Sequence, residues 1–363
     1  MKAVVCYGEG IVRYEDVEEP VVKPGTVKIN VKACGICGSD IPRAMKKSAH
    51  SYPIILGHEF AGVVTEIGEG VSSVEIGDHV TAAPLIPCHE CEDCKKGLFS
   101  LCKNYSFIGS RQQGANAEYI VVPEANVVKI NKAIPFEQGA LFEPSTVALH
   151  AVYLNDFEPD GYTAILGGGT MGLFALQWSK ILGAKKVVVF GRDKKHLELA
   201  TRLGADKVIS TLDADFMQAA MEETEGHGYD YVFEAAGSTV TMKYAFELAA
   251  NRSHVCFIGT PTQELSFTVK EWEQINRKEF KLTGSWMSYS NPFPGTEWTE
   301  TERCFSDGSL IFDEDVFYAK FSMSDAQEAF NLFNDQKKVK GRILLVNDRE
   351  LKMKTKSGKK QGK

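Results

Sequence analysis

The sequence lacks the features that mark membrane-spanning, exported and nucleic-acid-binding proteins. No apolar run approaches the ~18 residues that a bilayer-spanning helix needs. The opening residues, MKAVVCYGEGIVRYED, reach acidic side chains too early for a signal-peptide hydrophobic region. The formal net charge of −7 over 363 residues gives no sign of a nucleic-acid partner. We therefore expect a cytoplasmic protein with neither a membrane nor a nucleic-acid partner.

Internal repeats and an even scatter of cysteines are also missing. Four of the nine cysteines fall in one stretch, PCHECEDCKKGLFSLC, which in a chain without export signals favours metal binding over disulfides. With 44% hydrophobic residues the chain can bury a sizeable core, and its length favours two domains. Residues 348–363 are Lys-rich and predict a disordered, solvated tail, with attraction to a membrane or RNA as the alternative.

Two patterns of secondary structure follow one another along the chain. Up to about residue 150, short β-rich runs such as TVKINVKAC alternate with Gly and Pro, which is typical of a barrel-like all-β unit. From about residue 160, apolar strands alternate with helices, as in a parallel sheet covered on both faces. We predict an α/β protein in which residues 1–155 and 290–347 form one domain and residues 156–289 form a doubly wound Rossmann domain.

A glycine loop opens the second pattern. In AILGGGTMGLF, Gly167, Gly169 and Gly172 have the G-x-G-x-x-G spacing, and the following helix begins near Thr170 and Met171. The first glycine allows a tight turn, the second lets backbone amides approach a pyrophosphate, and the third lets helix and strand pack closely. The helix N-terminus faces the phosphates with its partial positive charge. These residues predict binding of a dinucleotide.

The next strand bears on which dinucleotide binds. An NAD site usually ends this strand with Asp or Glu, which binds the ribose hydroxyls. Here VVVFGRD places Gly191 at that position and Arg192 after it, which favours the 2′-phosphate of NADP. A shift of one or two residues would instead make Asp193 the acid of an NAD site. We expect NADP, with NAD as the alternative.

The cysteine-rich stretch predicts a closed metal site. Its thiols have spacings of x2, x2 and x7 and belong to Cys88, Cys91, Cys94 and Cys102. Four thiolates complete a tetrahedral zinc shell without room for substrate, so the expected role is to hold a lobe at residues 84–105. An iron–sulfur cluster is the alternative, which the x7 gap and the missing Cys-Pro ending disfavour.

A second, more widely spread set predicts an open metal site. CGICGSD supplies Cys37, LGHEFAG supplies His58 and Glu59, and ALFEPSTVALHA supplies Glu143. A thiolate, an imidazole and a carboxylate are suitable ligands for a zinc ion that keeps one position open. We therefore expect two zinc ions per chain, one structural and one catalytic.

Taken in order, the chain resembles the medium-chain, zinc-containing alcohol and polyol dehydrogenases. The segments that carry the resemblance are GICGSD, GHEFAGVV, GVSSVEIGDHV, the four-cysteine lobe, EPSTVALHA and GGGTMG. The resemblance implies a GroES-like catalytic domain, a Rossmann domain, hydride transfer between a CH–OH group and a nicotinamide cofactor, and a homodimer or homotetramer. It also implies that Cys37, His58 and Glu143 bind the catalytic zinc, that Glu59 binds it directly or through water, and that the lobe cysteines bind the structural zinc.

One residue matches the family's proton path, and two positions, Pro42 and Gly191, depart from the family pattern. Ser39 matches a serine that passes the alcohol proton outwards, although a turn hydroxyl bonded to backbone is the alternative. Pro42 stands about where alcohol dehydrogenases often carry a relay histidine, so water or His50 would continue the path. The cofactor strand lacks its usual acid at Gly191.

A narrower similarity is to galactitol-1-phosphate 5-dehydrogenases and other sugar-alcohol-phosphate enzymes. It is carried by GSDIPRAMKKSAHSYPIILGHEF, YSFIGSRQQG and TGSWMSYSNPFPGTEW. It implies oxidation of galactitol 1-phosphate to tagatose 6-phosphate, with a pentitol phosphate such as arabitol phosphate or an unphosphorylated polyol such as sorbitol as alternatives. The substrate phosphate needs cations, for which the candidates are Arg43, Lys46, Lys47 and Arg111. The alternative of another class is a non-catalytic zinc-ribbon or nucleotide-binding protein.

Overall fold

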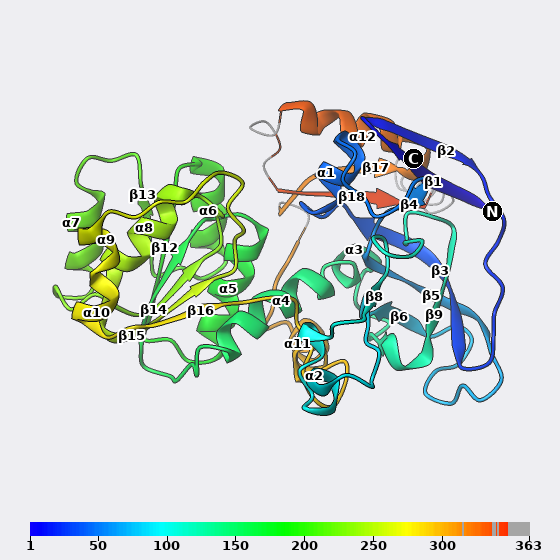
Figure 1. Cartoon of the computed structure of the whole chain (residues 1–363), viewed down its shortest axis with the longest axis horizontal. Coiled ribbons are helices and arrows are strands. Elements are labelled where there is room, and N and C mark those ends of the chain that lie inside the picture. Colours follow the sequence, from blue (N-terminus) through cyan, green and yellow to red (C-terminus); the bar gives the residue numbers. More distant parts are fainter. Residues whose placement is uncertain (314–315, 336–338, 340, 348–363) are drawn as a thin grey trace, which may run out of the picture. The chain divides into compact units, whose positions relative to one another are not determined.

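The chain folds into two compact units in the computed structural model, which describes residues 1–313, 316–335, 339 and 341–347 (Figure 1). The first unit comprises residues 1–143, 289–306 and the chain from 312 onward, and the second comprises 144–288 and 307–311. The division falls inside helix α4 (Phe142–Tyr153), whereas the sequence pattern changes just after this helix. The domain limits expected from the pattern stay a prediction, and the tail at 348–363 lies outside the described residues.

The strands of the first unit form three sheets. The largest has seven strands in the order β10-β6-β5-β3-β18-β17, with β9 also paired to β3; a smaller sheet has the order β2-β1-β4, and β7 pairs with β8. Their bounds are β1 Lys2–Gly8, β2 Ile11–Asp16, β3 Thr26–Gly35, β4 Ile54–Ile55, β5 Glu59–Ile67, β6 His79–Ala82, β7 Leu85–Ile86, β8 Ser106–Phe107, β9 Tyr119–Pro123, β10 Val127–Lys129, β17 Phe317–Ser322 and β18 Arg342–Val346.

Short helices connect and cover these strands. They are α1 Asp40–Met45, α2 Glu92–Lys95, α3 Phe136–Gly139, α11 Thr296–Asp307 and α12 Ala326–Asn331, with single 3₁₀ turns at Phe99–Leu101, Glu124–Asn126, Met323–Asp325 and Leu332–Asp335. The strand β3 shows why the sheets form: Val27, Ile29 and Val31 are fully buried at alternate positions, as one buried sheet face requires. These side chains belong to the same core cluster as Phe60 of β5 and Phe330 of α12.

The second unit is a parallel six-stranded sheet with the Rossmann order. Its strands run β13-β12-β11-β14-β15-β16, so the chain starts in the middle, moves to one edge and then reverses to the other. The bounds are β11 Tyr162–Leu166, β12 Lys186–Gly191, β13 Lys207–Ser210, β14 Tyr229–Glu234, β15 Ala249–Phe257 and β16 Lys281–Gly284. The predicted fold class, a doubly wound sheet with a β-rich partner unit, is confirmed.

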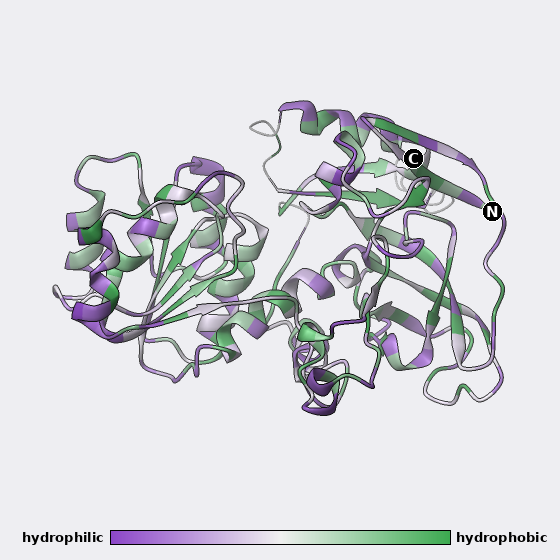
Figure 2. Cartoon of the chain, viewed as in Figure 1, coloured by the Kyte–Doolittle hydropathy of each residue, from purple (hydrophilic) through white to green (hydrophobic). Residues whose placement is uncertain are grey.

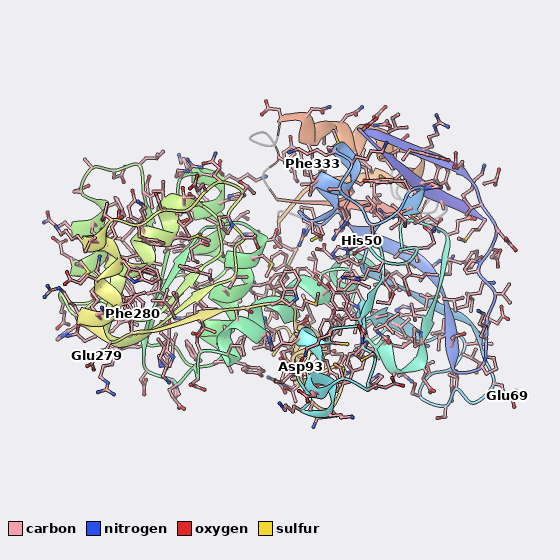
Figure 3. All side chains as sticks on the ribbon, in the orientation of Figure 1. His50, Glu69, Asp93, Glu279, Phe280 and Phe333 are labelled. Carbon is pink, nitrogen blue, oxygen red and sulfur yellow. The ribbon has the colours of Figure 1, made fainter. Side chains whose placement is uncertain are left out.

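Helices lie on both faces of this sheet (Figure 1). They are α5 Thr170–Ile181, α6 Lys194–Arg202, α7 Phe216–Glu222, α8 Thr239–Leu248, α9 Val269–Trp272 and α10 Gln274–Lys278. Helix α4 contacts α5, where Trp178 Nε1 donates to the Ser145 carbonyl oxygen at 3.0 Å. Hydrophobic residues concentrate in the strands (Figure 2), and the turn between α10 and β16 shows the contrast, with Glu279 exposed and Phe280 buried in the core (Figure 3). None of the helices in the described part of the chain is both long and apolar enough to cross a membrane.

The glycine loop follows β11, where the order of the strands reverses. Gly167 has φ +113°, a backbone conformation that favours glycine. A Cβ atom on Gly172 would lie 1.7 Å from the carbonyl oxygen of Gly167, so helix α5 can start this close to β11 only with glycine there. A Cβ on Gly169 would meet no atom within 4 Å, so Gly169 leaves open space beside the start of α5.

We expect Gly172→Ala to destabilise the second unit and Gly169→Ala to leave its stability nearly unchanged. Overpacking against a backbone oxygen forces a shift of the helix and costs roughly 1–3 kcal/mol. Thermal unfolding followed by circular dichroism measures both variants. Equal melting temperatures for the two would contradict the packing role of Gly172.

Candidate functional site

The antiparallel pairing of β3 and β5 gathers the predicted open metal site. Gly35 at the end of β3 pairs with Glu59 at the start of β5, so the chain just beyond β3 lies next to the chain just before β5. As a result, ligand atoms of Cys37, His58 and Glu59 lie within 4.8 Å of one another. Glu143, at the start of α4, is not in this group of three, but it is half-buried and interacts electrostatically with His58.

Two glycines make this gathering possible. A Cβ on Gly35 would lie 2.4 Å from Glu59 Oε2, so a side chain there would displace the glutamate. Gly57, directly before His58, has φ +94°, and a Cβ there would lie 2.5 Å from Asn116 Oδ1. Gly35 and Gly57 lie in the two segments from which Cys37, Ser39, His58 and Glu59 were predicted, but neither glycine was itself predicted.

A buried aspartate that the sequence analysis did not identify lies behind His58. Asp40 has no exposed surface, and its Oδ1 lies 3.6 Å from His58 Nδ1. Its Oδ2 accepts a hydrogen bond of 3.2 Å from the backbone N–H of Cys37. Asp40 thus contacts two of the three gathered residues, and its position directly after Ser39 was the signal that could have found it.

A buried arginine from the far end of the chain completes the surroundings. Strand β18 pairs with β3, which places Arg342 next to the end of β3. Its Nη2 lies 3.0 Å from Glu59 Oε1, and its Nη1 donates to the carbonyl oxygen of Ile36 at 3.2 Å. Because Arg342 and Ile36 are 306 positions apart, no local sequence pattern could have identified this residue.

The titratable groups show that negative charge is in excess. Burial by itself lowers the pKa of His58, but the charges of Asp40, Cys37 and Glu143 outweigh burial and raise this pKa to about 10. Burial raises the pKa of Glu143 to about 7, against the attraction of His58. Burial likewise raises the pKa of Asp40. All three shifts favour the protonated form, which reduces the negative charge.

These residues fit a divalent cation. Both carboxylate oxygens of Glu59 are buried without a hydrogen bond, which is uncommon for polar atoms, although Oε1 has Arg342 as an ionic partner. Asp40 Oδ1 and His58 Nδ1 are also buried without a hydrogen bond and face each other at 3.6 Å. Cysteine sulfur, histidine nitrogen and carboxylate oxygen are the ligands of zinc sites with an open position. A carboxylate behind a histidine, as Asp40 lies behind His58, is typical of the surroundings of zinc-binding histidines.

The four lobe cysteines also come together. Their sulfur atoms lie within 4.8 Å of one another, with Cys88 Sγ 3.5 Å from Cys102 Sγ and 4.0 Å from Cys94 Sγ. Backbone N–H groups, that of Cys94 foremost, lower the pKa of the Cys91 thiol to about 6, which favours the thiolate that metals bind. The donor set fits a structural zinc ion.

The loops of the second unit keep the arrangement expected for a dinucleotide. Thr170 and Met171 begin α5, and Gly169 is its N-cap without a side-chain cap, so backbone N–H groups are available there. Gly191 ends β12, and Arg192 after it is exposed. Asp193, the alternative acid, is the N-cap of α6 and accepts a hydrogen bond of 3.1 Å from the His196 backbone N–H.

The four candidate cations for a substrate phosphate differ in their surroundings. Lys46 and Lys47 are exposed, and Lys47 Nζ lies 3.9 Å from Glu9 Oε1. Arg43 Nη1 donates hydrogen bonds to the carbonyl and hydroxyl oxygens of Ser39 at the start of α1. Arg111 is exposed, and its guanidinium carbon lies 4.4 Å from the centroid of the Tyr105 ring.

We expect Asp40→Asn to weaken zinc binding by about 10- to 100-fold, the usual effect of removing a carboxylate behind a metal-binding histidine. The substitution keeps the size of the side chain but removes its charge. Zinc retained in competition with a chelator measures the affinity. Asp16→Asn, at an exposed aspartate paired with Lys2, is the matched control. Equal zinc retention by both variants would contradict the role of Asp40.

Comparison with known proteins agrees with these features. The sequence models of the alcohol dehydrogenase GroES-like domain and of zinc-binding dehydrogenases match residues 23–132 and 170–302. Galactitol 1-phosphate 5-dehydrogenase of Escherichia coli K12 is 38% identical over 95% of this chain and 100% of its own length. Sorbitol dehydrogenase of Bacillus subtilis is 31% identical over 91% of this chain and 92% of its own.

Solved structures show the same relationship. The crystal structure of the Escherichia coli galactitol-1-phosphate dehydrogenase superposes with a TM-score of 0.90 at 37% identity and covers 95% of this chain and 100% of that one. A structure from Sinorhizobium meliloti 1021 bound to NADP superposes with a TM-score of 0.86 at 28% identity and covers 95% and 98%. The chain therefore belongs to the zinc-dependent alcohol and polyol dehydrogenases, oxidoreductases that act on CH–OH groups.

Proposed function

We propose that this enzyme oxidises a sugar-alcohol phosphate, with galactitol 1-phosphate as substrate and tagatose 6-phosphate as product. The position of Arg111 is the observation that supports a phosphorylated substrate. Its guanidinium lies over Tyr105, the Tyr105 ring meets Phe107 edge-on, and the Phe107 ring meets His58 edge-on with 5.4 Å between centroids. Consecutive ring contacts therefore connect an exposed cation to a candidate metal ligand.

This arrangement suits a substrate whose charge is remote from its reacting carbon. In galactitol 1-phosphate the phosphate is on carbon 1 and oxidation occurs at carbon 5, so the binding cation must be near the metal ligands without adjoining them. Arginine binds phosphate through paired donors, and stacking on Tyr105 reduces the freedom that the side chain would lose on binding. Lys46 and Lys47 are exposed and have no aromatic support of this kind.

Four residues would hold the catalytic zinc: Cys37, His58 and Glu143 as ligands, with Glu59 binding directly or through water. A zinc ion held there would supply Lewis acidity to the alcohol oxygen, and a bound nicotinamide cofactor would supply the hydride acceptor. Asp40 orients His58, and Arg342 balances the charge of Glu59. Ser39, whose hydroxyl contacts Cys37, receives the alcohol proton at Oγ and passes its own hydroxyl proton outwards to water or His50.

For the cofactor we propose NADP in preference to NAD. Gly167, Gly169 and Gly172 suit a loop around a pyrophosphate, and Arg192 directly follows Gly191, the position at which an NAD site usually has its acid. Asp193 accepts a hydrogen bond at the start of α6, and the strand itself ends at Gly191, which has no carboxylate for ribose hydroxyls. The NADP-bound relative from Sinorhizobium meliloti supports the choice.

Other details of the proposal await separate tests. A pentitol phosphate is the alternative substrate, and an unphosphorylated polyol is the second, in keeping with the name of the Bacillus subtilis relative. Two zinc ions per chain, the second bound by the lobe cysteines, are tested by metal analysis of the purified protein. A homodimer or homotetramer and a cytoplasmic location stay predictions, the first testable by mass measurement in solution.

We expect catalytic efficiency to be higher for galactitol 1-phosphate than for galactitol, and Arg111→Met to remove most of the difference. Losing a charge-assisted contact of about 1.5–3 kcal/mol corresponds to roughly a 10- to 100-fold rise in KM for the phosphorylated substrate. Steady-state kinetics on a panel of polyols and their phosphates measures this. Arg13→Met is the matched control, since Arg13 is exposed and also lies over a tyrosine, Tyr7. No gain from the phosphate in the wild type would defeat the proposed substrate.

We expect Arg192→Ala to raise KM for NADP by about 10- to 100-fold, because a guanidinium contact with the 2′-phosphate is lost. KM for NAD should change little. Lys194→Ala removes an exposed charge two residues away and serves as the control. A strong preference of the wild type for NAD would show instead that the ribose site accepts hydroxyls.

A further inference from the structure

We propose that Arg43 is a positioning residue for the Ser39 hydroxyl and not a contact for the substrate phosphate. The inference deepens the proposed function, because it rests on Ser39 as the group that takes the alcohol proton. Ser39 and Arg43 lie one helical turn apart, at the start and in the last turn of α1. Their contacts show what each side chain does.

The Ser39 hydroxyl is not used as a helix cap. Serine at an N-cap usually accepts a hydrogen bond from a backbone N–H of the first turn. Ser39 is the N-cap of α1 but makes no such bond. Its Oγ instead donates to Cys37 Sγ at 3.4 Å and accepts a hydrogen bond from Arg43 Nη1 at 3.0 Å. The hydroxyl therefore joins a candidate metal ligand to a cation.

The guanidinium of Arg43 is engaged by its own helix. Nη1 also donates to the Ser39 carbonyl oxygen at 2.8 Å and lies 3.5 Å from Asp40 Oδ1. The Tyr52 hydroxyl donates to the Arg43 carbonyl oxygen at 2.6 Å, which fixes the backbone from which the side chain starts. Only 21% of the Arg43 side chain is exposed. Turning it towards a phosphate would break its contacts with Ser39 and with the buried Asp40.

The chemistry of the two groups sets the direction of the hydrogen bond. A guanidinium has donors and no acceptor, so it occupies a lone pair of Ser39 Oγ. The second lone pair of Oγ is left to accept the alcohol proton, and the hydrogen that now donates to Cys37 Sγ is the one that the hydroxyl gives up to water. Without Arg43 the hydroxyl could rotate and donate elsewhere. Removing Arg43 should therefore lower the rate of turnover more than it weakens substrate binding.

Arg43 also connects the serine to the residue behind His58. Asp40 Oδ1 lies 3.5 Å from Arg43 Nη1 and 3.6 Å from His58 Nδ1, so one carboxylate oxygen lies near both side chains. The guanidinium thus offsets part of the charge of a fully buried carboxylate. A lysine would keep the charge but lose the fork that reaches both Ser39 and Asp40.

A double-mutant cycle of Arg43→Met and Ser39→Ala tests the proposal. On both a polyol and its phosphate, Arg43→Met should lower kcat by roughly 10- to 100-fold and leave KM nearly unchanged. In the Ser39→Ala background the same substitution should have little further effect, because Arg43 acts through Ser39. Arg43→Lys should recover part of the loss. Arg13→Met, at an exposed arginine over Tyr7, is the control and should keep the wild-type kcat.

A spectroscopic measurement independent of turnover accompanies the kinetics. In cobalt-substituted enzyme, the thiolate-to-cobalt charge-transfer band responds to hydrogen bonds at the Cys37 sulfur. Ser39→Ala removes the bond of 3.4 Å to this sulfur, and Arg43→Met releases the hydroxyl that makes it. Both variants should shift the band in the same direction, and the double variant no further. Equal metal content and equal melting temperature exclude misfolding as the cause.

Several outcomes would overturn the positioning role. A KM increase confined to phosphorylated substrates, with kcat unchanged, would make Arg43 a phosphate contact. Losses that multiply in the double variant, or an unshifted band in Arg43→Met, would show that it acts independently of Ser39. If the phosphate gives the wild type no advantage, the proposed substrate fails, but the cycle run on the polyol still decides the role of Arg43. If no polyol is oxidised, the cobalt band decides it alone.

Discussion

Buried negative charge around Cys37 is the constraint on which the first unit's functional chemistry depends. Asp40 and Glu59 are buried, and Glu143 and the Cys37 sulfur are partly so. Isolated buried carboxylates are costly unless a cation or several hydrogen bonds compensate them. Arginines supply part of the compensation, and the raised pKa values of the histidine and the carboxyls supply more by protonation. A divalent cation at the same place would allow the carboxylates to stay charged and the histidine to stay neutral.

The fold meets this constraint through one strand. β9 pairs with the first half of β3, whereas β5 and β18 pair with its carboxyl end, so two segments that are distant in the sequence reach that end. Glu59 begins β5 and His58 directly precedes it, and β18 contributes Arg342, which balances Glu59. Glycine at position 35 is needed for the same reason, because any side chain there would occupy the place of the Glu59 carboxylate. The charge balance is therefore a product of strand pairing, and a change of register by one residue would separate the partners.

The sequence was informative wherever the signal was local. Period-2 burial in β3, the glycine spacing after β11 and the spacing of the lobe cysteines are all readable within a few residues, and the fold class is confirmed. Arg342 could not be predicted, because its contact with Glu59 is created by a sheet pairing between the two ends of the chain. Asp40 was adjacent to a predicted residue, yet only the fold shows that it is buried and faces His58. A sequence also does not distinguish an exposed arginine from one that is hydrogen-bonded to its own helix. Arg43 and Arg111 were therefore both candidates for binding the substrate phosphate.

The contacts of Arg43 also limit how a proton can leave Ser39. A guanidinium is always protonated and cannot accept a proton, so Arg43 cannot substitute for a relay histidine. Pro42 has no polar side chain, and His50 lies in the exposed segment after α1 (Figure 3). Within the described part of the chain no hydrogen bond connects His50 to Ser39, whereas Ser39 itself is exposed. Water is then the acceptor that the arrangement favours, and the arginine contributes by holding the hydroxyl in place while the proton is exchanged.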